Sequence, residues 1–469
     1  MADSTRAEVY PEQSAARNYG LHAGILGPVE TLAQSVSAVA PTASPTLTIP
    51  LVFALADNAT WFVYLLATIA IFLVGFCVSR FARISVSPGS LYTYTSGTLP
   101  PACGALAAWA LLLAYIATGA SVAAGALYYG TTLARQWAHW SPSAILVLAG
   151  VCAVAGYIAW RDVKLSAEVM LWIEGVSVSI ILVILAALVF HFGLRLDWDQ
   201  FRLRGVTFSS LGPALVLAIF SFVGFESATS LGAEVRNPRH TIPRAVLLCA
   251  LLVGTFFIFC SYSEVLGFRS LSSKLSETTS PLHQLAAVAG VSPLGIAIDI
   301  GAMVSMFACV LACDTAASRL LMKMAHEGLM PRMLERTNAR HGTPGAAIAL
   351  STSLMFVSTA VLTLCRVNAL DIYDIAGSLS VFGFLTAYAL TAFALPFARR
   401  AAGQHSLVIA AVSTATVVVM LLIALFDLQS ATDVVHGRLI PEIYLGYVVL
   451  GMLVYLFRRK ASPALPSRG

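Results

Sequence analysis

The chain has 469 residues, of which 58% are hydrophobic and only 11% are charged, and its formal net charge is +5. Soluble proteins carry about 25% charged residues, so this composition excludes a soluble fold and indicates an all-α polytopic membrane protein. The basic residues are scattered over short loops and form no single basic surface for a nucleic acid. The eight cysteines form no CxxC pair and are interpreted as packing residues, not metal ligands.

Windows of about 20 apolar residues predict twelve membrane spans. They lie near 26–55, 60–81, 101–130, 142–160, 166–191, 210–234, 244–267, 292–322, 344–365, 372–397, 405–427 and 441–457. With a cytoplasmic N-terminus, twenty of the 28 Lys and Arg residues fall on the cytoplasmic side, as the positive-inside rule requires. We therefore expect a multi-pass protein of the cytoplasmic (inner) membrane with both termini in the cytoplasm.

The first and sixth spans carry residues that interrupt a helix. Residues 40–45 read APTASP, and proline at 41 and 45 removes two amide donors, so a straight helix through 37–45 is not expected. The sixth span holds FSFVGFE at 220–226, a glycine and a carboxylate inside an apolar run. Breaks at membrane depth are tolerated only where they line a cavity or are buried in protein. The alternative for the first span, a Pro-kinked packing helix, stays open.

Paired breaks in spans 1 and 6 are what an inverted five-plus-five repeat places in matching positions, and secondary transporters use them as binding sites. We expect a substrate ammonium to meet free carbonyls near 40–42 and 220–223, and a carboxylate to meet free amides near 43–46. The candidate substrate-binding residues are Ala40, Pro41, Thr42, Ala43, Ser44, Phe220, Ser221, Phe222, Val223, Gly224 and Glu226.

Three segments together resemble the signatures of the amino acid–polyamine–organocation (APC) superfamily of permeases. They read RFARISVSPGSLYTY at 80–94, FSFVGFESATSLGAEVRNPRHTIPRA at 220–245 and ASRLLMKMAHEGLMP at 317–331. The resemblance implies a leucine-transporter-type fold, with a ten-helix core over 26–397 and inverted repeats over about 26–191 and 210–397. Spans 11 and 12 (405–457) would lie outside the repeat, between cytoplasmic tails at 1–25 and 458–469.

Two positions depart from that superfamily. A Gly-Ser-Gly type motif is common in its first-span break, whereas residues 43–45 here are Ala-Ser-Pro. Many proton-coupled members carry a lysine in the fifth span, where this chain has Ser177, with Glu174 one turn earlier. Two kinds of coupling stay open: protons through Glu174, or a sodium ion held by first-span carbonyls and the hydroxyls of Thr315 and Ser318.

Acidic residues at bilayer depth are costly and are functional hypotheses by default. Glu226 is interpreted as a gate or a contact for the substrate amine, or as a cap of the restarted helix. Glu174, without a local cation, suits a proton carrier because burial disfavours the charged form; a neutral, hydrogen-bonded acid is the alternative. We expect Asp314 to pair with Arg319 or another cation. These acids, with Asp299, favour a cationic amine as substrate, whereas the resemblance favours amino acids.

Charges at the inner ends of spans 1, 6 and 8 suit a cytoplasmic gate. The candidates are Glu30, Glu234, Arg236 and Arg319, and Glu30 or Glu234 is expected to pair with Arg319 or Arg236 when the site opens outward. Such partly solvated pairs are worth about 1 kcal/mol each. The alternative is a set of solvated charges that only reflects topology.

No HExxH, GxSxG or paired His/Asp motif occurs in a span, so no enzyme, resident metal or cofactor is expected, apart from a coupling ion. A channel or a sensor is a weaker alternative. The sequence therefore predicts a secondary active permease moving amino acids by alternating access, with ion-coupled uptake. The alternatives are an amine or polyamine permease and an amino acid exchanger. The expected partners are the small-molecule substrate and the lipid bilayer, with no obligate protein partner.

Overall fold

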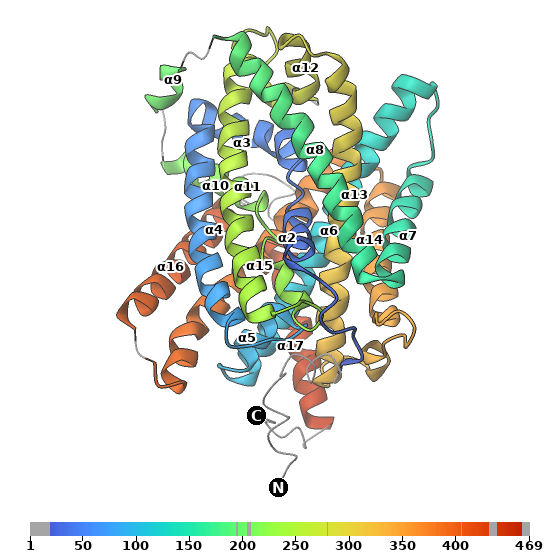
Figure 1. The fold of residues 1–469 in the computed structure, drawn as a ribbon, viewed down its shortest axis with the longest axis vertical. Coiled ribbons are helices and arrows are strands. Elements are labelled where there is room, and N and C mark those ends of the chain that lie inside the picture. Colours follow the sequence, from blue (N-terminus) through green and yellow to red (C-terminus); the bar gives the residue numbers. More distant parts are fainter. Residues whose placement is uncertain are drawn as a thin grey trace.

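The computed structural model describes residues 19–193, 196–203, 208–278, 280–404, 406–430 and 439–461. Over these ranges the chain is helical, and its only β pairing is one isolated parallel bridge between Leu26 and Val235. The long helices lie side by side along the longest axis of the molecule (Figure 1). An all-α bundle satisfies its backbone groups within each helix, as a lipid environment demands.

The longer α-helices are α2 (Pro28–Val39), α4 (Thr60–Ala82), α6 (Pro101–Ala138), α7 (Ala144–Arg161), α8 (Val163–His191), α10 (Phe208–Phe220), α11 (Pro238–Phe268), α13 (Pro293–His326), α14 (Gly345–Leu364), α15 (Ala369–Ala401), α16 (Leu407–Ser430) and α17 (Leu439–Ala461). The shorter ones are α3 (Ile49–Ala56), α5 (Ser90–Ser96), α9 (Trp198–Phe201) and α12 (Pro281–Val288). A π-helical segment η1 (Ser44–Thr48) and the 3₁₀ segments η2 (Asp57–Ala59), η3 (Ser227–Leu231), η4 (Leu275–Glu277) and η5 (Arg332–Glu335) complete the described elements.

Ten segments of the described chain are long and apolar enough to cross a membrane, not twelve. The predicted first and second spans run together as one apolar stretch, Pro28–Ala82. The predicted sixth span is divided, because α10 stops at Phe220 and its apolar part, Leu211–Phe220, is short. The remaining predicted spans coincide with single helices to within a few residues, except that α6, α11 and α13 extend further. The fold is therefore that of an all-α multi-pass membrane protein.

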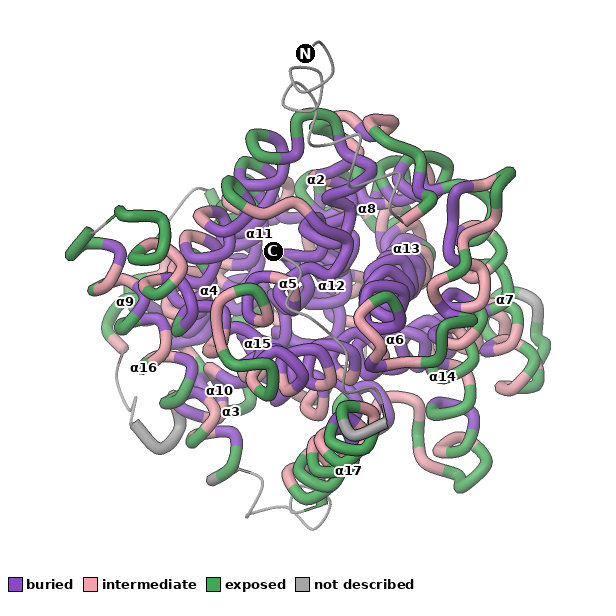
Figure 2. Tube along the Cα trace, turned by 90° about the horizontal axis from the view of Figure 1, so that it is seen from below, coloured by how far each residue is buried: buried purple, intermediate pink, exposed green. Residues whose placement is uncertain are grey.

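Burial follows the position of a helix in the bundle. Figure 2 shows buried residues concentrated in the centre, around α2, α6 and α13, and exposed residues on outer helices such as α7 and α17. The exposed faces of α16 and α17 are strongly apolar, with Leu421, Leu425, Leu453 and Phe457 among the exposed side chains. Apolar outer faces are expected where the surrounding solvent is lipid.

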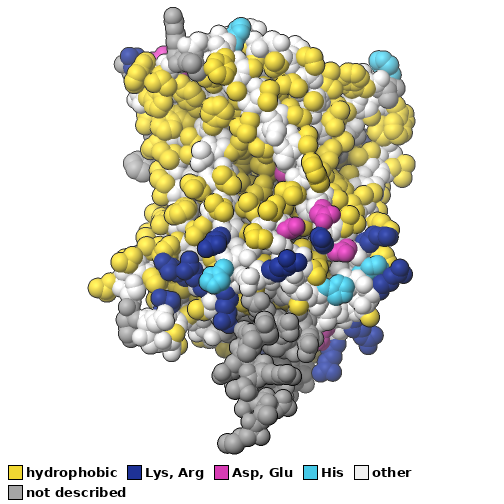
Figure 3. Space-filling model, in the orientation of Figure 1, with side chains coloured by type: hydrophobic (Ala, Val, Ile, Leu, Met, Phe, Trp, Pro, Cys, Tyr) yellow, Lys and Arg dark blue, Asp and Glu magenta, His cyan; other side chains and the backbone are white. Residues whose placement is uncertain are grey.

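Lys and Arg gather at one end of the molecule (Figure 3). We call this the basic end; it is where α2 and α11 begin and α4 and α15 finish (Figure 1). Arg80 lies in the last turn of α4, and Arg399 and Arg400 lie in the last turn of α15. The other side of the bundle, where α11 ends and α4 begins, is called the opposite end.

Candidate functional site

The first interruption separates α2 from α3. The helix ends at Val39, and Ala40 adopts a left-handed conformation with φ 51°. The backbone then restarts as the π-helical η1, with Pro45 near its start. Because neither Pro41 nor Pro45 has an amide to donate, the α-helical ladder stops here. The continuous Pro-kinked alternative is therefore wrong.

The second interruption follows α10, which ends at Phe220. Residues 221–226 form turns before η3, and Gly224 adopts φ 88°, a conformation that side chains with a Cβ rarely adopt. A Cβ at Gly224 would lie 2.9 Å from the carbonyl oxygen of Ala38. The turn after α10 therefore packs directly against the end of α2, and the two interruptions meet in the middle of the bundle.

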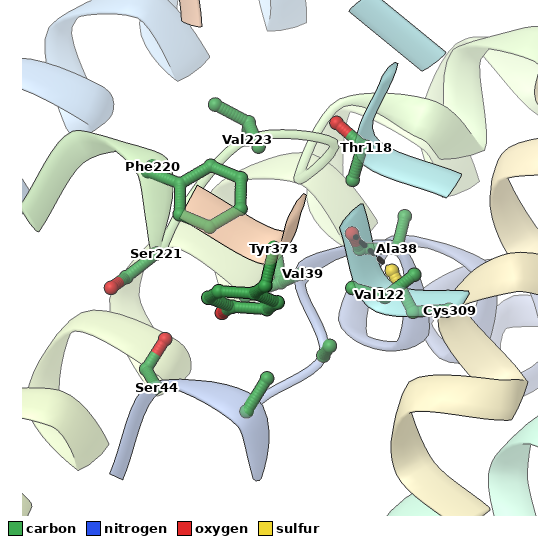
Figure 4. A pocket seen from close by; sticks show the side chains of 12 residues that line it. Ala38, Val39, Ser44, Thr118, Val122, Phe220, Ser221, Val223, Cys309 and Tyr373 are labelled. Atoms are coloured by element: carbon green, nitrogen blue, oxygen red, sulfur yellow. Dashed lines mark hydrogen bonds between the residues drawn. The ribbon is translucent and has the colours of Figure 1, made fainter. Parts of the chain in front are cut away.

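A small cavity of about 10 Å³ lies where the interruptions meet (Figure 4). Its lining comes from the α2 break, the α10 break, α6, α13 and α15. It consists of Ala38, Val39, Ala40, Ala43, Ser44, Thr118, Val122, Phe220, Ser221, Val223, Cys309 and Tyr373. None of these lining residues is charged. Any charged group of a ligand must therefore be met by backbone groups, hydroxyls and the thiol.

Two aromatic rings cover one side of this cavity. The rings of Phe220 and Tyr373 meet edge to face with centroids 5.6 Å apart. The Tyr373 hydroxyl lies 3.1 Å from the Thr48 hydroxyl in η1, and Ser121 of α6 donates to the Tyr373 carbonyl at 2.5 Å. Tyr373 thus ties α15 to both α6 and the restarted first helix.

Polar groups at the cavity come from helix ends and hydroxyls. Helix ends leave oriented carbonyls and amides without intrahelical partners. The carbonyl of Ala38 accepts the Cys309 thiol at 3.2 Å. Among the described residues the buried hydroxyl of Thr118 has no hydrogen-bond partner. By contrast, the amide of Ala43 already donates to the Ala40 carbonyl at 2.8 Å, and that of Thr46 to Thr42 at 3.3 Å. The expectation of free amides over 43–46 is wrong for these two.

Six of the eleven predicted substrate-binding residues line the cavity: Ala40, Ala43, Ser44, Phe220, Ser221 and Val223. The lining does not include Pro41, Thr42, Phe222, Gly224 and Glu226. The residues that sequence reasoning missed are Ala38, Val39, Thr118, Val122, Cys309 and Tyr373. Four of these six stand on α6, α13 and α15, which are largely buried, so no clear periodic signal marked the face turned towards the cavity.

Glu226 is fully buried between two tyrosines. Tyr115 of α6 donates to its Oε1 at 2.9 Å, and Tyr388 of α15 donates to its Oε2 at 2.6 Å. Its side chain makes no capping hydrogen bond to η3, although Glu226 stands at the N-cap position. The acid therefore links the second break to α6 and α15, and this geometry does not support the capping interpretation.

Glu174 lies one layer behind the cavity wall. Ser305 of α13 donates to its two oxygens at 3.0 and 2.9 Å, and Ser177 lies 3.4 Å from the Gly301 carbonyl. Cys309 stands one turn after Ser305 on the same face of α13, and its side chain lines the cavity. The buried acid of α8 is thus connected to the wall of the cavity through one turn of α13.

The two hydroxyls proposed for sodium differ in their hydrogen-bond partners. Ser318 donates to the Thr315 carbonyl of its own helix at 3.1 Å. The buried Thr315 hydroxyl has no partner among the described residues. In the same parts of the chain, no group of three or more His, Cys, Asp or Glu side chains could hold a metal ion.

Glu234 and Arg319 form a bidentate ion pair near the basic end. Arg319 Nε lies 2.6 Å from Glu234 Oε2, and Arg319 Nη2 lies 2.9 Å from Glu234 Oε1. The Arg319 side chain is 1% exposed and the Glu234 side chain is 0% exposed. The expected pairing is present, but the expectation that it is partly solvated is wrong. Asp314 does not pair with Arg319 as expected, since it accepts hydrogen bonds from Ser351 and Thr352.

Glu30 and Arg236 have other partners. Glu30 accepts the Gly27 amide at 3.0 Å in a capping box at the start of α2. Arg236 donates from Nε to the Gly24 carbonyl at 2.9 Å. The Leu26 amide donates to the Glu234 carbonyl at 3.1 Å, and the Arg236 amide to the Leu26 carbonyl at 2.8 Å. These hydrogen bonds hold the segment before α2 against the backbone on either side of Val235.

A multi-pass helical bundle with two interrupted helices around a small cavity is the architecture of a membrane transporter. The family model for amino acid permeases matches residues 32–435, which is most of the chain. The chain therefore belongs to the amino acid permease family of the APC superfamily, whose members are transporters and not enzymes.

Relatives named for three kinds of substrate are similar to this chain. The vacuolar cationic amino acid transporter 2 of Arabidopsis thaliana is 25% identical over 352 residues, which cover 71% of this chain and 53% of the relative. A branched-chain amino acid permease of Bacillus subtilis is 24% identical over 302 residues, which cover 61% of this chain and 63% of the relative. A low-affinity putrescine importer of Escherichia coli is 27% identical over 296 residues, which cover 61% of this chain and 63% of the relative. The matches thus span only 53–63% of the lengths of these relatives.

Solved structures of a manganese transporter from Eremococcus coleocola share the fold. A mutant of that transporter superimposes with a TM-score of 0.60 at 12% identity, over 92% of this chain and 94% of the other. The same transporter bound to an aromatic bis-isothiourea substituted compound also gives 0.60, at 13% identity and the same coverage. At this identity the likeness concerns the fold alone.

Proposed function

We propose that this protein is a secondary active transporter that moves amino acids across the cytoplasmic membrane by alternating access. The observation that carries the proposal is the meeting of two interrupted helices at a small, uncharged cavity. Interrupted helices offer oriented backbone groups to a zwitterion, and a site buried in mid-bundle must be opened to each side in turn.

The orientation of the chain follows from its charge distribution. The basic end would face the cytoplasm, as the positive-inside rule requires. Counting the interrupted helices as crossings gives twelve spans, with both termini inside. The repeats would cover about 26–191 and 210–397, with 405–457 added outside them and tails at 1–25 and 458–469. In this orientation the Glu234–Arg319 pair seals the cytoplasmic side.

The cavity favours a small amino acid over a cationic amine. Ser44 and Thr118 would hold the carboxylate, because the Ala43 and Thr46 amides are already used. Carbonyls at the end of α2 and around 220–223 would hold the ammonium. The apolar walls at Val122 and Val223 suit a small aliphatic side chain.

The acids that favoured an amine lie outside the cavity lining. Glu174, Glu226 and Asp314 accept hydrogen bonds from hydroxyl groups. Asp299 lies 2.6 Å from His283 Nδ1. None of these carboxylates is therefore positioned to meet a second ammonium group in the cavity.

Uptake of labelled amino acids, amines and polyamines into proteoliposomes tests this function. We expect accumulation of a small aliphatic amino acid, driven by an imposed gradient of pH or Na⁺. Accumulation of putrescine or another amine alone would favour the amine permease. Uptake that requires a counter-substrate inside would favour an exchanger.

We predict that Glu174→Gln removes the pH dependence of uptake, because glutamine cannot carry a proton. With the membrane potential clamped, a gradient of one pH unit supports up to about tenfold accumulation when one proton moves with each substrate. The variant should lose this accumulation while keeping substrate exchange. Glu168→Gln is the matched control, since Glu168 lies on the same helix in an exposed pair with Lys164.

Accumulation by Glu174→Gln that still follows the pH gradient would count against proton coupling through this acid. Accumulation driven by Na⁺ in the wild type would instead favour the sodium alternative at Thr315 and Ser318. The hydrogen bond from Ser318 to its own helix is the reason that we favour protons.

A further inference from the structure

Glu264 is a buried acid that the proposed function does not use. It lies near the end of α11, in the half of the bundle away from the basic end, and is fully buried. Neither of its carboxylate oxygens has a hydrogen-bond partner among the described residues. Glu174 and Glu226 are different, because hydroxyl groups donate to both. A carboxylate charge without a hydrogen bond or a counter-ion is very costly in an apolar interior, so such a group takes up a proton.

Tyr64 stands on the helix next to that of this acid. It lies on α4, which runs beside α11 in both views (Figures 1 and 2), and its ring packs against that of Phe257 on α11. The Tyr64 hydroxyl lies 3.0 Å from the Ser221 hydroxyl, and Ser221 lines the cavity. Each hydroxyl can both donate and accept. The Tyr64–Ser221 pair can therefore pass a proton between the cavity and the side of α4 that packs on α11.

The other titratable groups on elements near Glu264 interact with residues other than Glu264. Cys260 stands one turn earlier on α11 and is fully buried. Three of the described charged groups nearby are in ion pairs: His283 of α12 with Asp299, Lys274 with Glu277, and Arg269 with Asp197. Two acids have hydrogen-bond donors: Glu174 of α8 accepts from Ser305, and Glu30 of α2 accepts from the Gly27 amide. No cation of the described chain forms an ion pair with Glu264, so a proton is the ligand that fits.

We propose that Glu264 is a second proton-binding site, which takes up one proton when substrate is enclosed and exchanges it with the cavity through Tyr64 and Ser221. When the opposite end opens, water that enters the cavity reaches Ser221 and allows the carboxylate to ionise. Closure around substrate expels this water, and the carboxylate takes its proton from a hydronium ion, which leaves as neutral water. No other bond changes. The coupling to substrate rests on the proposed function, whereas protonation of Glu264 does not.

The first test needs no substrate. Infrared difference spectra of purified wild type, Glu264→Gln and Ser263→Ala should show a protonated-carboxyl C=O band that only Glu264→Gln loses. Ser263 is the matched control because its buried hydroxyl also lacks a partner. An unchanged band in Glu264→Gln would overturn the proposal, whatever the protein transports.

The second test counts protons with an indicator dye in weak buffer as a bound amino acid saturates the protein. The count per substrate should fall by one in Glu264→Gln. One linked proton changes the apparent affinity for substrate by up to about tenfold per pH unit. The pH dependence of the affinity should therefore be weaker in Glu264→Gln than in the wild type by up to that factor. An unchanged count would overturn the coupling. Absence of binding by the wild type would overturn the proposed function, and the infrared band would still decide on Glu264.

A third variant covers the case in which Glu264→Gln does not fold. Tyr64→Phe keeps the ring packed on Phe257, 5.7 Å between centroids, and removes only the hydroxyl. Proton uptake should slow in this variant while its thermal stability stays close to that of the wild type. Uptake at the wild-type rate would overturn the relay.

Discussion

Arg319→Glu is expected to abolish transport while leaving much of the substrate binding intact. The substitution places a second carboxylate beside Glu234 in a site where both side chains are almost completely buried. Breaking a buried ion pair costs about 3–5 kcal/mol. Conformations of a carrier differ by only a few kcal/mol, so this cost is enough to hold the basic end open.

Trapping can be measured at Cys309, which is buried in the cavity wall. A membrane-impermeant thiol reagent added on the cytoplasmic side should label Cys309 in Arg319→Glu and much less in the wild type, as mass spectrometry of the labelled peptide would show. Substrate binding in detergent and uptake in proteoliposomes complete the comparison.

Two further variants control for non-specific damage. Lys164→Glu disrupts an exposed pair whose side chains are 52% and 51% exposed, and such pairs are worth about 0–1 kcal/mol. It should transport normally. The double exchange Glu234→Arg with Arg319→Glu should restore part of the transport. Normal transport by Arg319→Glu alone would place the gate elsewhere and leave these charges with a purely topological role.

Gly224→Leu is expected to abolish substrate binding without loss of membrane insertion. The glycine has φ 88°, and a Cβ there would lie 2.9 Å from the Ala38 carbonyl oxygen and 3.0 Å from the Ala38 Cβ. Left-handed strain costs about 1–3 kcal/mol, and overpacking adds about 1–3 kcal/mol. The two interruptions would be pushed apart and the cavity between them lost. Insertion depends on the apolar segments, which are unchanged.

Binding assays and size-exclusion profiles of the detergent-solubilised protein would measure these two outcomes. Gly150→Leu on α7 is the matched control, because a Cβ at Gly150 meets no atom within 4 Å. Gly224→Ala should have a smaller effect than leucine. A wild-type affinity in Gly224→Leu would contradict the position assigned to the binding site.

The spans and both interruptions could be predicted from the sequence because their causes are local. An apolar window defines a segment that lipid can surround. Pro41 and Pro45 cannot donate amide hydrogen bonds, and Gly224 supplies a conformation that other residues avoid. These effects depend on residues a few positions apart, so no knowledge of packing is needed to find them.

The partners of the buried charged residues could not be predicted from the sequence, because they lie on segments that are distant in the chain and meet only when the helices pack. The sequence marked Glu234 and Arg319 as gate candidates, but it did not exclude Glu30 or Arg236, and it suggested a solvated pair. The structure buries Glu234 with Arg319. It gives Asp314 two hydroxyl partners on α14 and places Glu226 between two tyrosines.

The sequence by itself determined the class of protein, the approximate place of its apolar segments, and the two points at which helices stop. The tertiary structure decided which residues line the cavity. Thr118, Val122, Cys309 and Tyr373 lie on helices α6, α13 and α15, which are largely buried. A helix that is apolar on every side has no polar face to fix its rotation, so only contact with its neighbours decides which side chains face the site.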